Sequence, residues 1–259
     1  MKFKIASKLL TGICLCLLSV MAFGQTQPTL QDMYPKRVGN LRFSATTLSF
    51  GKIRNNIIRV DTIRMYNSGS KSIRIATAGK IPAAVQVSIP TPEIGPSQAG
   101  FMLVQYDPSK KNDYGFVLDR FFLNTNDTIQ PSKNINITAN IQPSFPPMTA
   151  ADSAVIQKSR MPMTVYDYGN IHSGEKAVHD FMLYNDGKSD LRILKSKTSC
   201  VCMKTTFGKE VVPAGDSTNV RVEFDSYGKE GNDSRKVNLY VNDPARPEVV
   251  LEMKGMISK

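Results

Sequence analysis

Two cysteines and a methionine in the C-terminal part of the chain are the residues best suited to chemistry. Cys200 and Cys202 flank Val201, and Met203 follows them directly. Sulfur atoms this close could form a disulfide, exchange with other thiols, or bind a soft metal such as Cu(I), which prefers thiolate and thioether ligands. They could also be small apolar residues at a strand edge, or cross-link the chain to a partner.

The spacing of the two cysteines bears on the disulfide. In an extended strand, the Cα atoms of residues i and i+2 lie about 6.6 Å apart, whereas the β-carbons of a disulfide prefer a separation of about 3.8 Å. Val201 resists the positive backbone angles that would bring Cys200 and Cys202 together. A bridge within a strand would therefore be strained and easily reduced. Our first interpretation is a structural or bridging role, with redox exchange as an alternative.

Copper binding is the other alternative for this site. Met203 would add a thioether to the two thiolates, and Met161, Met163 or His179 could supply a further ligand. We predict no resident metal and no cofactor. Cys200, Cys202 and Met203 remain the candidate ligands if a metal is present.

Few other residues could support catalysis. The chain has two histidines, His172 and His179, and no tryptophan. His172 falls in a predicted turn and His179 in a predicted strand, and 179 − 172 = 7 positions separate them, too many for a pair on one strand face. The sequence contains no nucleophile elbow and no phosphate-binding glycine loop. We predict no catalytic residues and a protein that is not an enzyme.

An internal sequence repeat indicates the domains that must position these residues. Residues 48–141 match residues 166–257 at a nearly fixed offset, 187 − 69 = 118 for most positions and 242 − 126 = 116 for the last. The matching segments are Leu48–Ile53 with Tyr166–Ile171, Met65–Gly69 with Leu183–Gly187, Ile73–Ile75 with Leu191–Ile193, Tyr106-Asp107 with Phe224-Asp225, and Asn126-Asp127 with Asn242-Asp243. The chain therefore contains two copies of one domain.

Each copy is predicted to be β-sheet, because short runs of branched and aromatic residues alternate with turn signals. About seven strands in fewer than about 100 residues are typical of a β-sandwich. In the second copy the strands are predicted at Met163–Tyr168, Ala177–Tyr184, Asp190–Lys195, Met203–Phe207, Thr218–Phe224, Lys236–Val241 and Val249–Met256. Asn67-Ser68-Gly69 and Asn185-Asp186-Gly187 are predicted to supply the positive backbone angles of tight reversals.

The N-terminus has the three parts of a secretory signal peptide. Lys2, Lys4 and Lys8 precede an apolar run that ends in Ala22-Phe23-Gly24. The run is shorter than the roughly 20 residues of a membrane-spanning helix, and no later segment is long and apolar enough to span. We therefore expect an exported protein, periplasmic or on the cell surface, with no transmembrane segment after cleavage.

The distribution of charge, rather than its net value, argues against a nucleic-acid partner. The whole chain carries +11, and removal of residues 1–24 takes away three lysines and no acid, which leaves 30 − 22 = +8. The basic residues are scattered, and aromatic residues do not interleave with them as a stacking platform requires. Solvated surface is the better interpretation.

The predicted organisation has five parts. The segment at 142–161 is rich in proline and is expected to be a semi-rigid linker, whereas a polar leader at 25–40 is expected to be poorly ordered. The parts are a signal peptide at 1–24, the leader at 25–40, a first immunoglobulin-like sandwich at 41–141, the linker at 142–161 and a second sandwich at 162–259.

The second copy resembles a known family through an ordered set of motifs. They are Asp167-Tyr168-Gly169, Tyr184-Asn185-Asp186-Gly187, Ser199-Cys200-Val201-Cys202, Pro213-Ala214-Gly215-Asp216-Ser217, Phe224-Asp225 and Asn242-Asp243. The family comprises secreted, uncharacterised tandem domains common in Bacteroidota, related to the ASH/Hydin and major-sperm-protein group. The resemblance, weaker in the first copy, implies an immunoglobulin-like fold and export, but no activity.

Two departures from the family pattern concern the cysteines. The family's Ser-Cys-Gly-Cys-Thr is here Ser199-Cys200-Val201-Cys202-Met203, and the first copy has Pro82 and Ala84 at the cysteine positions. The fold is therefore not expected to depend on the cysteine pair.

These observations predict an all-β protein of two tandem immunoglobulin-like β-sandwich domains. We expect a non-enzymatic interaction or structural module whose partner is another envelope protein, contacted through sheet faces, loops or edge strands. The alternatives are a thiol-redox or copper-handling protein using Cys200-Val201-Cys202-Met203, and a carbohydrate-binding module, which the lack of tryptophan disfavours. The sequence does not indicate an oligomeric state.

Overall fold

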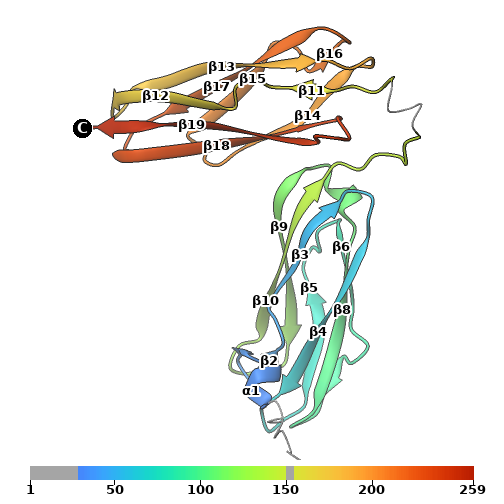
Figure 1. The fold of residues 1–259 in the computed structure, drawn as a ribbon. Coiled ribbons are helices and arrows are strands. Elements are labelled where there is room, and N and C mark those ends of the chain that lie inside the picture. Colours follow the sequence, from blue (N-terminus) through green and yellow to red (C-terminus); the bar gives the residue numbers. More distant parts are fainter. Residues whose placement is uncertain (1–28, 150–154) are drawn as a thin grey trace, which may run out of the picture.

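The computed structural model describes residues 29–149 and 155–259 and consists almost entirely of β-strands. Figure 1 shows two elongated β-sandwiches joined by one connecting segment. Each sandwich has its own cluster of buried apolar side chains. The predicted class, two tandem immunoglobulin-like sandwiches, is confirmed. The predicted signal peptide lies outside the described residues, and within them no helix has the length and hydropathy to cross a bilayer.

The first sandwich packs two five-stranded sheets together, in the orders β1-β2-β4-β8-β6 and β3-β10-β9-β5-β7. Its strands pair antiparallel except β3, which runs parallel to β10. The elements are α1 (Leu30–Met33), β1 (Lys36–Val38), β2 (Leu41–Phe43), β3 (Thr47–Arg54), β4 (Arg59–Asn67), β5 (Ile73–Ala78), β6 (Val85–Ser88), β7 (Glu93–Ile94), β8 (Ala99–Tyr106), the 3₁₀ turn η1 (Pro108–Lys111), β9 (Gly115–Thr125) and β10 (Ser132–Gln142).

The second sandwich repeats this plan with a four-stranded sheet, β11-β13-β17-β15, and a five-stranded sheet, β12-β19-β18-β14-β16. Only β12 and β19 pair in parallel. The strands are β11 (Ser159–Arg160), β12 (Val165–His172), β13 (Lys176–Asn185), β14 (Leu191–Thr198), β15 (Met203–Phe207), β16 (Val211–Val212), β17 (Ser217–Asp225), β18 (Gly231–Val241) and β19 (Glu248–Ser258).

Strict alternation along the long strands builds each core. In β10, Ile135, Ile137, Ala139 and Ile141 are buried, while the residues that alternate with them face outward. Burying a side chain of this size contributes about 1.5–3 kcal/mol. The period of two therefore fixes both the core and the outer face of each sheet.

All seven strands predicted in the second copy are present. β15 has the predicted bounds, and the other strands differ at their ends, most in β18, which begins at Gly231 rather than Lys236, 236 − 231 = 5 residues earlier. The two-residue strands β11 and β16 escaped prediction because so short a segment has no detectable period.

Strand β12 contains a bulge at a glycine and continues to His172, beyond its predicted end at Tyr168. Gly169 has φ +72°, and the register of β12 with β19 shifts between Asp167 and Asn170. Gly51, at the equivalent position of β3, has φ +61°. A bulge places one residue in the left-handed region, which glycine adopts without strain. The repeated glycine therefore marks a bulge in each copy.

Two segments predicted to be leader and linker contribute to the sandwiches. Tyr34 is buried and β1 pairs with β2, so the leader at 25–40 is structured from α1 onward, and its predicted disorder is wrong there. Within the linker at 142–161, β11 pairs with β13, and Met161 is buried in the second core. Both segments are too short to carry a sheet period.

The two sandwiches contact each other where β9 begins, near β14 and β18 (Figure 1). The Nζ of Lys197 lies 2.8 Å from a carboxylate oxygen of Asp113 and donates to the carbonyl of Phe116 at 3.0 Å. The rings of Tyr114 and Tyr240 stack with centroids 5.9 Å apart. These contacts tie the first sandwich to the second beyond the covalent connection.

Candidate functional site

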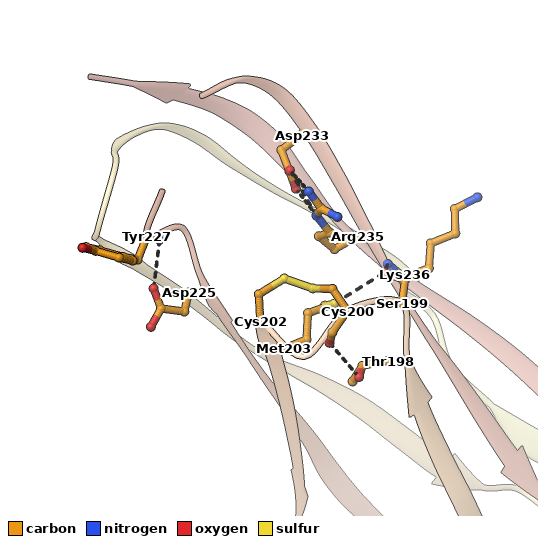
Figure 2. The surroundings of a disulfide bond; sticks show 10 residues. All are labelled: Thr198, Ser199, Cys200, Cys202, Met203, Asp225, Tyr227, Asp233, Arg235 and Lys236. Carbon is orange, nitrogen blue, oxygen red and sulfur yellow. Dashed lines mark hydrogen bonds and ion pairs between the residues drawn. A yellow bond between two sulfur atoms is a disulfide. The ribbon is translucent and has the colours of Figure 1, made fainter. Parts of the chain in front are cut away.

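Cys200 and Cys202 form a disulfide at the turn between β14 and β15 (Figure 2). Their Cα atoms lie 5.1 Å apart. The N–H of Met203 donates to the carbonyl of Cys200 at 3.3 Å, which closes a β-turn over the motif. The cysteines therefore lie in a turn and not at the strand edge that one alternative gave them, because the chain turns at Val201 and brings them closer than an extended strand does.

Hydrogen bonds to the carbonyls of the two cysteines hold this turn on both sides. The hydroxyl of Thr198 donates to the carbonyl of Cys200 at 2.9 Å, and the N–H of Asp225 donates to the carbonyl of Cys202 at 2.9 Å. Met203 is buried, with its sulfur 4.0 Å from the Ser199 hydroxyl (Figure 2). The bonds to the two cysteines are accepted by their carbonyl oxygens and do not involve their sulfur atoms.

A cleft of about 370 Å³ opens beside Cys202. Val201, one of the residues that line it, is fully exposed, and Tyr227 is 81% exposed. Three lysines and two carboxylates join them. The lining residues are Lys176, Val201, Cys202, Met203, Lys204, Glu223, Asp225, Tyr227 and Lys229.

The first sandwich builds the same turn without sulfur. Pro82 lies at 200 − 82 = 118 positions before Cys200, and the N–H of Val85 donates to its carbonyl at 2.8 Å. The N–H of Asp107 donates to the carbonyl of Ala84 at 2.8 Å, as Asp225 does to Cys202. The turn therefore forms from the backbone pattern alone, as the lack of cysteines in the first copy led us to expect.

The further ligands considered for Cu(I) have other surroundings. Met161 is buried in the second core, Met163 is half exposed, and the ring of His179 packs on Tyr166. In the part of the chain that the structure describes, no group of three or more His, Cys, Asp or Glu residues is arranged to hold a metal. A Cu(I) site at Cys200 and Cys202 would also require the disulfide to be reduced first.

The two histidines lie apart, as their spacing predicts. His172 is exposed at the end of β12, with Nδ1 3.8 Å from the Glu175 carboxylate. The ring of His179 stacks on Tyr166 with centroids 4.0 Å apart and meets Phe181 edge-on at 4.6 Å. Burial lowers the pKa of His179 below the ordinary 6.5, and the nearby charge of Asp180 opposes this only in part.

We expect the second sandwich to lose stability as the pH falls below about 6.5, because the unfolded chain then takes up a proton that folded His179 accepts only at lower pH. The stabilisation is complete above the unfolded pKa and disappears as the pH falls through the lowered folded pKa. His179→Phe should flatten this dependence between about pH 7 and pH 5. Thermal unfolding followed at a series of pH values measures it, with His172→Gln as the control. An unchanged slope in His179→Phe would contradict the expectation.

The repeated Asn-x-Gly motifs serve the fold. The amide of Asn185 donates to the carbonyls of Ser189 and Val212, each at 2.8 Å, and its Oδ1 accepts from the N–H of Gly187 at 3.0 Å. In the first copy, the buried Asn67 bonds to Lys71, Ile94 and Gly69 at 2.8, 2.9 and 2.9 Å. Each asparagine therefore holds together three segments of its own sandwich.

The role predicted for the two glycines of these motifs is wrong. Neither Gly69 nor Gly187 is among the residues with positive φ. A β-carbon on Gly187 would lie 2.4 Å from the Cα of Gln157 and from the Ile156 carbonyl, and one on Gly69 would lie 3.0 Å from the Asn40 side chain. Close packing against the preceding segment explains glycine here.

A buried ion pair in the β9–β10 connection was not predicted. The Nζ of Lys133 lies 2.5 Å from Oδ2 of Asp127, and both side chains are fully buried. Burial alone would raise the pKa of Asp127, but hydrogen bonds from Lys133 and from the N–H groups of Asn40 and Ile129 lower it below its usual range. The pair lies six residues apart across a turn, a spacing that carries no sequence signal.

The outer face of β9 is the most apolar exposed strand surface of the first sandwich. Phe116, Leu118 and Phe122 point away from the core and are 65%, 51% and 42% exposed. Sequence reasoning missed this face because every second residue of β9 is also apolar, which conceals the side that faces solvent. Arg120 lies between Leu118 and Phe122 on the same face and donates to Asn136 at 3.1 Å.

Comparisons with known proteins identify the fold of both sandwiches and leave the function open. Residues 160–257 match the family model described as "Protein of unknown function (DUF1573)". This stretch covers the second sandwich and includes both cysteines. No curated protein matches the chain.

Among solved structures, the chain is similar to a protein of unknown function from Porphyromonas gingivalis W83. The TM-score is 0.58 at 17% identity, with 84% of this chain and 100% of that chain covered. A weaker similarity, with a TM-score of 0.34 and 11% identity, is to the ASH/PapD-like domain of human CEP192, covering 45% of this chain and 94% of that one. The first similarity supports the two-sandwich fold alone.

Proposed function

We propose that the protein is a non-enzymatic binding module of the cell envelope and that the outer face of β9 is its contact surface. The observation that carries the proposal is the row of Phe116, Leu118 and Phe122, three large apolar side chains exposed on one strand. Central aromatic and aliphatic anchors of this kind supply most of the binding energy in protein interfaces. Their position on a rigid strand means that they need little ordering on binding.

The charges around this face indicate the chemistry of the partner. Arg120 lies within the apolar row, and Lys52 and Arg54 face outward at the end of β3 in the same sheet. In strands β3, β5, β9 and β10, all of which are described throughout, Asp119 is the only acidic residue, and it is buried. Glu93 of β7, at the far edge of the sheet, is exposed but lies 3.7 Å from Arg74. We therefore propose a protein partner that presents carboxylates around an apolar patch.

The disulfide supports the proposed export. Disulfides persist in oxidising compartments such as the periplasm and the cell surface, and are rare in the cytosol. Cys200 and Cys202 are bridged, which agrees with the signal peptide expected at residues 1–24. The partner is accordingly proposed to be another envelope protein.

Substitution of the apolar row tests the contact surface. Leu118→Asp and Phe122→Asp should each weaken capture of the partner from native envelope at least about tenfold, because each places a carboxylate in the centre of the contact. Both positions are exposed, so the fold should tolerate the change. Quantitative capture on immobilised full-length protein measures the effect.

Val250→Asp is the matched control, since Val250 is an exposed apolar residue of β19 in the second sandwich. Its capture should equal that of the wild type. Equal capture by all variants would refute the proposed surface.

A carbohydrate partner is the second candidate, and one specific observation favours it. Two partly exposed asparagines of β10 lie directly across from aromatic residues of β9, Asn140 from Phe116 and Asn134, whose Oδ1 is buried, from Phe122. A ring beside an amide could stack on a sugar and bond to its hydroxyls. Retarded migration of the protein in gels that contain envelope polysaccharide, abolished in Phe122→Asp, would favour a sugar over a protein partner.

A further inference from the structure

We propose that the Cys200–Cys202 disulfide is an exchangeable bridge that oxidises a pair of thiols on another protein, with the sulfur of Cys202 as the atom attacked. This activity is additional to the proposed binding function. It rests on the position of the bridge, on the cleft beside it and on the cysteine-free turn of the first sandwich.

The fold does not need the bridge to form the turn. Pro82–Val85 makes the same backbone hydrogen bond as Cys200–Met203, and Ala84 accepts from Asp107 as Cys202 accepts from Asp225. A bridge that closes only three residues also removes little entropy from the unfolded chain, because this effect grows with loop length. Stabilisation of the fold is therefore a weak explanation for the presence of two cysteines at this turn.

The surroundings give a partner access to one sulfur. Cys202 lines the cleft of about 370 Å³, whereas Cys200 is not among its lining residues. Val201 projects fully into solvent, while Cys200 and Cys202 are partly buried against the second core, so the cleft is the side from which Cys202 can be approached. A thiol that enters the cleft meets Cys202 first.

The charges of the cleft favour a thiolate. Lys176, Lys204 and Lys229 line it together with Glu223 and Asp225, so the cations outnumber the carboxylates by one. Cations near a thiol stabilise the thiolate form, which is the nucleophile in exchange. In the first sandwich the positions 118 earlier than Lys176 and Lys204 are Ile58 and Gln86, so these two cations belong to the copy that carries the bridge.

The proposed reaction balances without an added cofactor. A thiolate of the partner attacks the Cys202 sulfur, the bond between the two sulfurs breaks, and the electron pair leaves on Cys200, which takes up a proton. The second thiol of the partner loses its proton and attacks the mixed disulfide at its own first sulfur, which releases Cys202. Two electrons pass to this protein, which ends with two thiols, and the partner ends with one disulfide.

Single-cysteine variants of the chain without residues 1–24, which contain Cys14 and Cys16, test which sulfur reacts. The probe is the aromatic disulfide 5,5′-dithiobis(2-nitrobenzoate), which reports a released thiol by absorbance. Cys200→Ser, which keeps Cys202, should react at least about tenfold faster than Cys202→Ser, which keeps Cys200, because only Cys202 lines the cleft. Equal rates, or a faster reaction at Cys200, would overturn the assignment of the attacked atom.

Reduction of the wild-type protein tests whether the bridge is exchangeable. Dithiothreitol, a simple dithiol, should release two thiols from the folded chain without residues 1–24, while the far-ultraviolet circular dichroism remains unchanged. Release only after addition of denaturant would overturn the proposal, and so would loss of the β-sheet signal during reduction in native buffer. Either result would identify a structural bridge.

Lysine substitutions test the role of the cleft. In the double variant Lys176→Gln and Lys204→Gln, reduction of the bridge by the glutathione thiolate should slow by a factor of about three or more, and most at low salt. Lys254→Gln, an exposed lysine of β19 in the same sandwich, should leave the rate unchanged. Equal slowing in both would show a general charge effect and contradict a specific cleft.

Discussion

Lys133→Met should lower the free energy of unfolding of the first sandwich by about 3–5 kcal/mol, because removal of one partner of a buried ion pair leaves the other charge without compensation. Asp127 is fully buried and lies 2.5 Å from Lys133. The carboxylate would keep its bonds from the N–H groups of Asn40 and Ile129 but lose its only cation. Denaturant unfolding of the full chain, with the two sandwiches followed separately, measures the loss.

The control is Lys80→Met, an exposed lysine of the same sandwich, which should change stability by less than about 0.5 kcal/mol. Acid should remove the contribution of the pair. The pKa of Asp127 is lowered in the folded state, so the contribution is complete above the unfolded pKa of about 4 and disappears as the pH falls through the folded pKa. A loss below about 1 kcal/mol in Lys133→Met would contradict the structure of the pair.

Asn185→Ala should lower the stability of the second sandwich by about 3 kcal/mol, because it leaves two carbonyls and one N–H without their partner in a buried site. The bonds lost are those to Ser189, Val212 and Gly187, together with a longer bond of 3.4 Å that Asn185 accepts from the N–H of Lys158. Chemical denaturation measures the change.

The internal repeat supplies a matched comparison for this substitution. Asn67→Ala should produce a loss of similar size in the first sandwich, because Asn67 makes the equivalent three bonds. Asn170→Ala, at an exposed position of β12, should have little effect. If Asn185→Ala and Asn170→Ala were equally mild, the motif would have no structural role.

Much of the fold could be predicted because the sequence motifs that indicate its turns and strands occur twice, once in each copy. The Asn-x-Gly motif and the glycine of the bulge each occur twice at the same offset, and β15 has the predicted bounds. The physical roles were harder to predict. Gly187 was expected to provide a positive backbone angle, but it is required because a β-carbon would contact Gln157 and Ile156, 187 − 157 = 30 and 187 − 156 = 31 positions away in sequence.

The candidate sites were predicted only in part. The cysteine pair stood out by spacing, but its turn depends on a hydrogen bond to Asp225, which is distant in sequence. The outer face of β9 could not be assigned, since Phe121 and Phe122 are neighbours of the same type and only packing distinguishes the buried one from the exposed one. Side chains that meet across sheets leave no local pattern.

Each copy contains an equivalent stacked pair of one Phe and one Tyr, but the two residue types occupy opposite positions in the two copies. Phe50 stacks on Tyr106 in the first sandwich, and Tyr168 stacks on Phe224 in the second, each with centroids 5.6 Å apart. The hydroxyl of Tyr106 bonds to Asp119, whereas that of Tyr168 is buried with no partner among the described residues. Burial raises the pKa of Tyr168 to about 12. The copies therefore keep the packing of the rings while their polar networks differ.

Site-specific photo-cross-linking in the native envelope tests the proposed binding function most directly. A photoreactive amino acid at position 118 should give one discrete cross-linked product with an envelope protein, because Leu118 lies at the centre of the exposed β9 face. The same amino acid at position 250 should give none. Absence of a product at position 118, or the same products at both positions, would contradict the account of β9 as the contact surface.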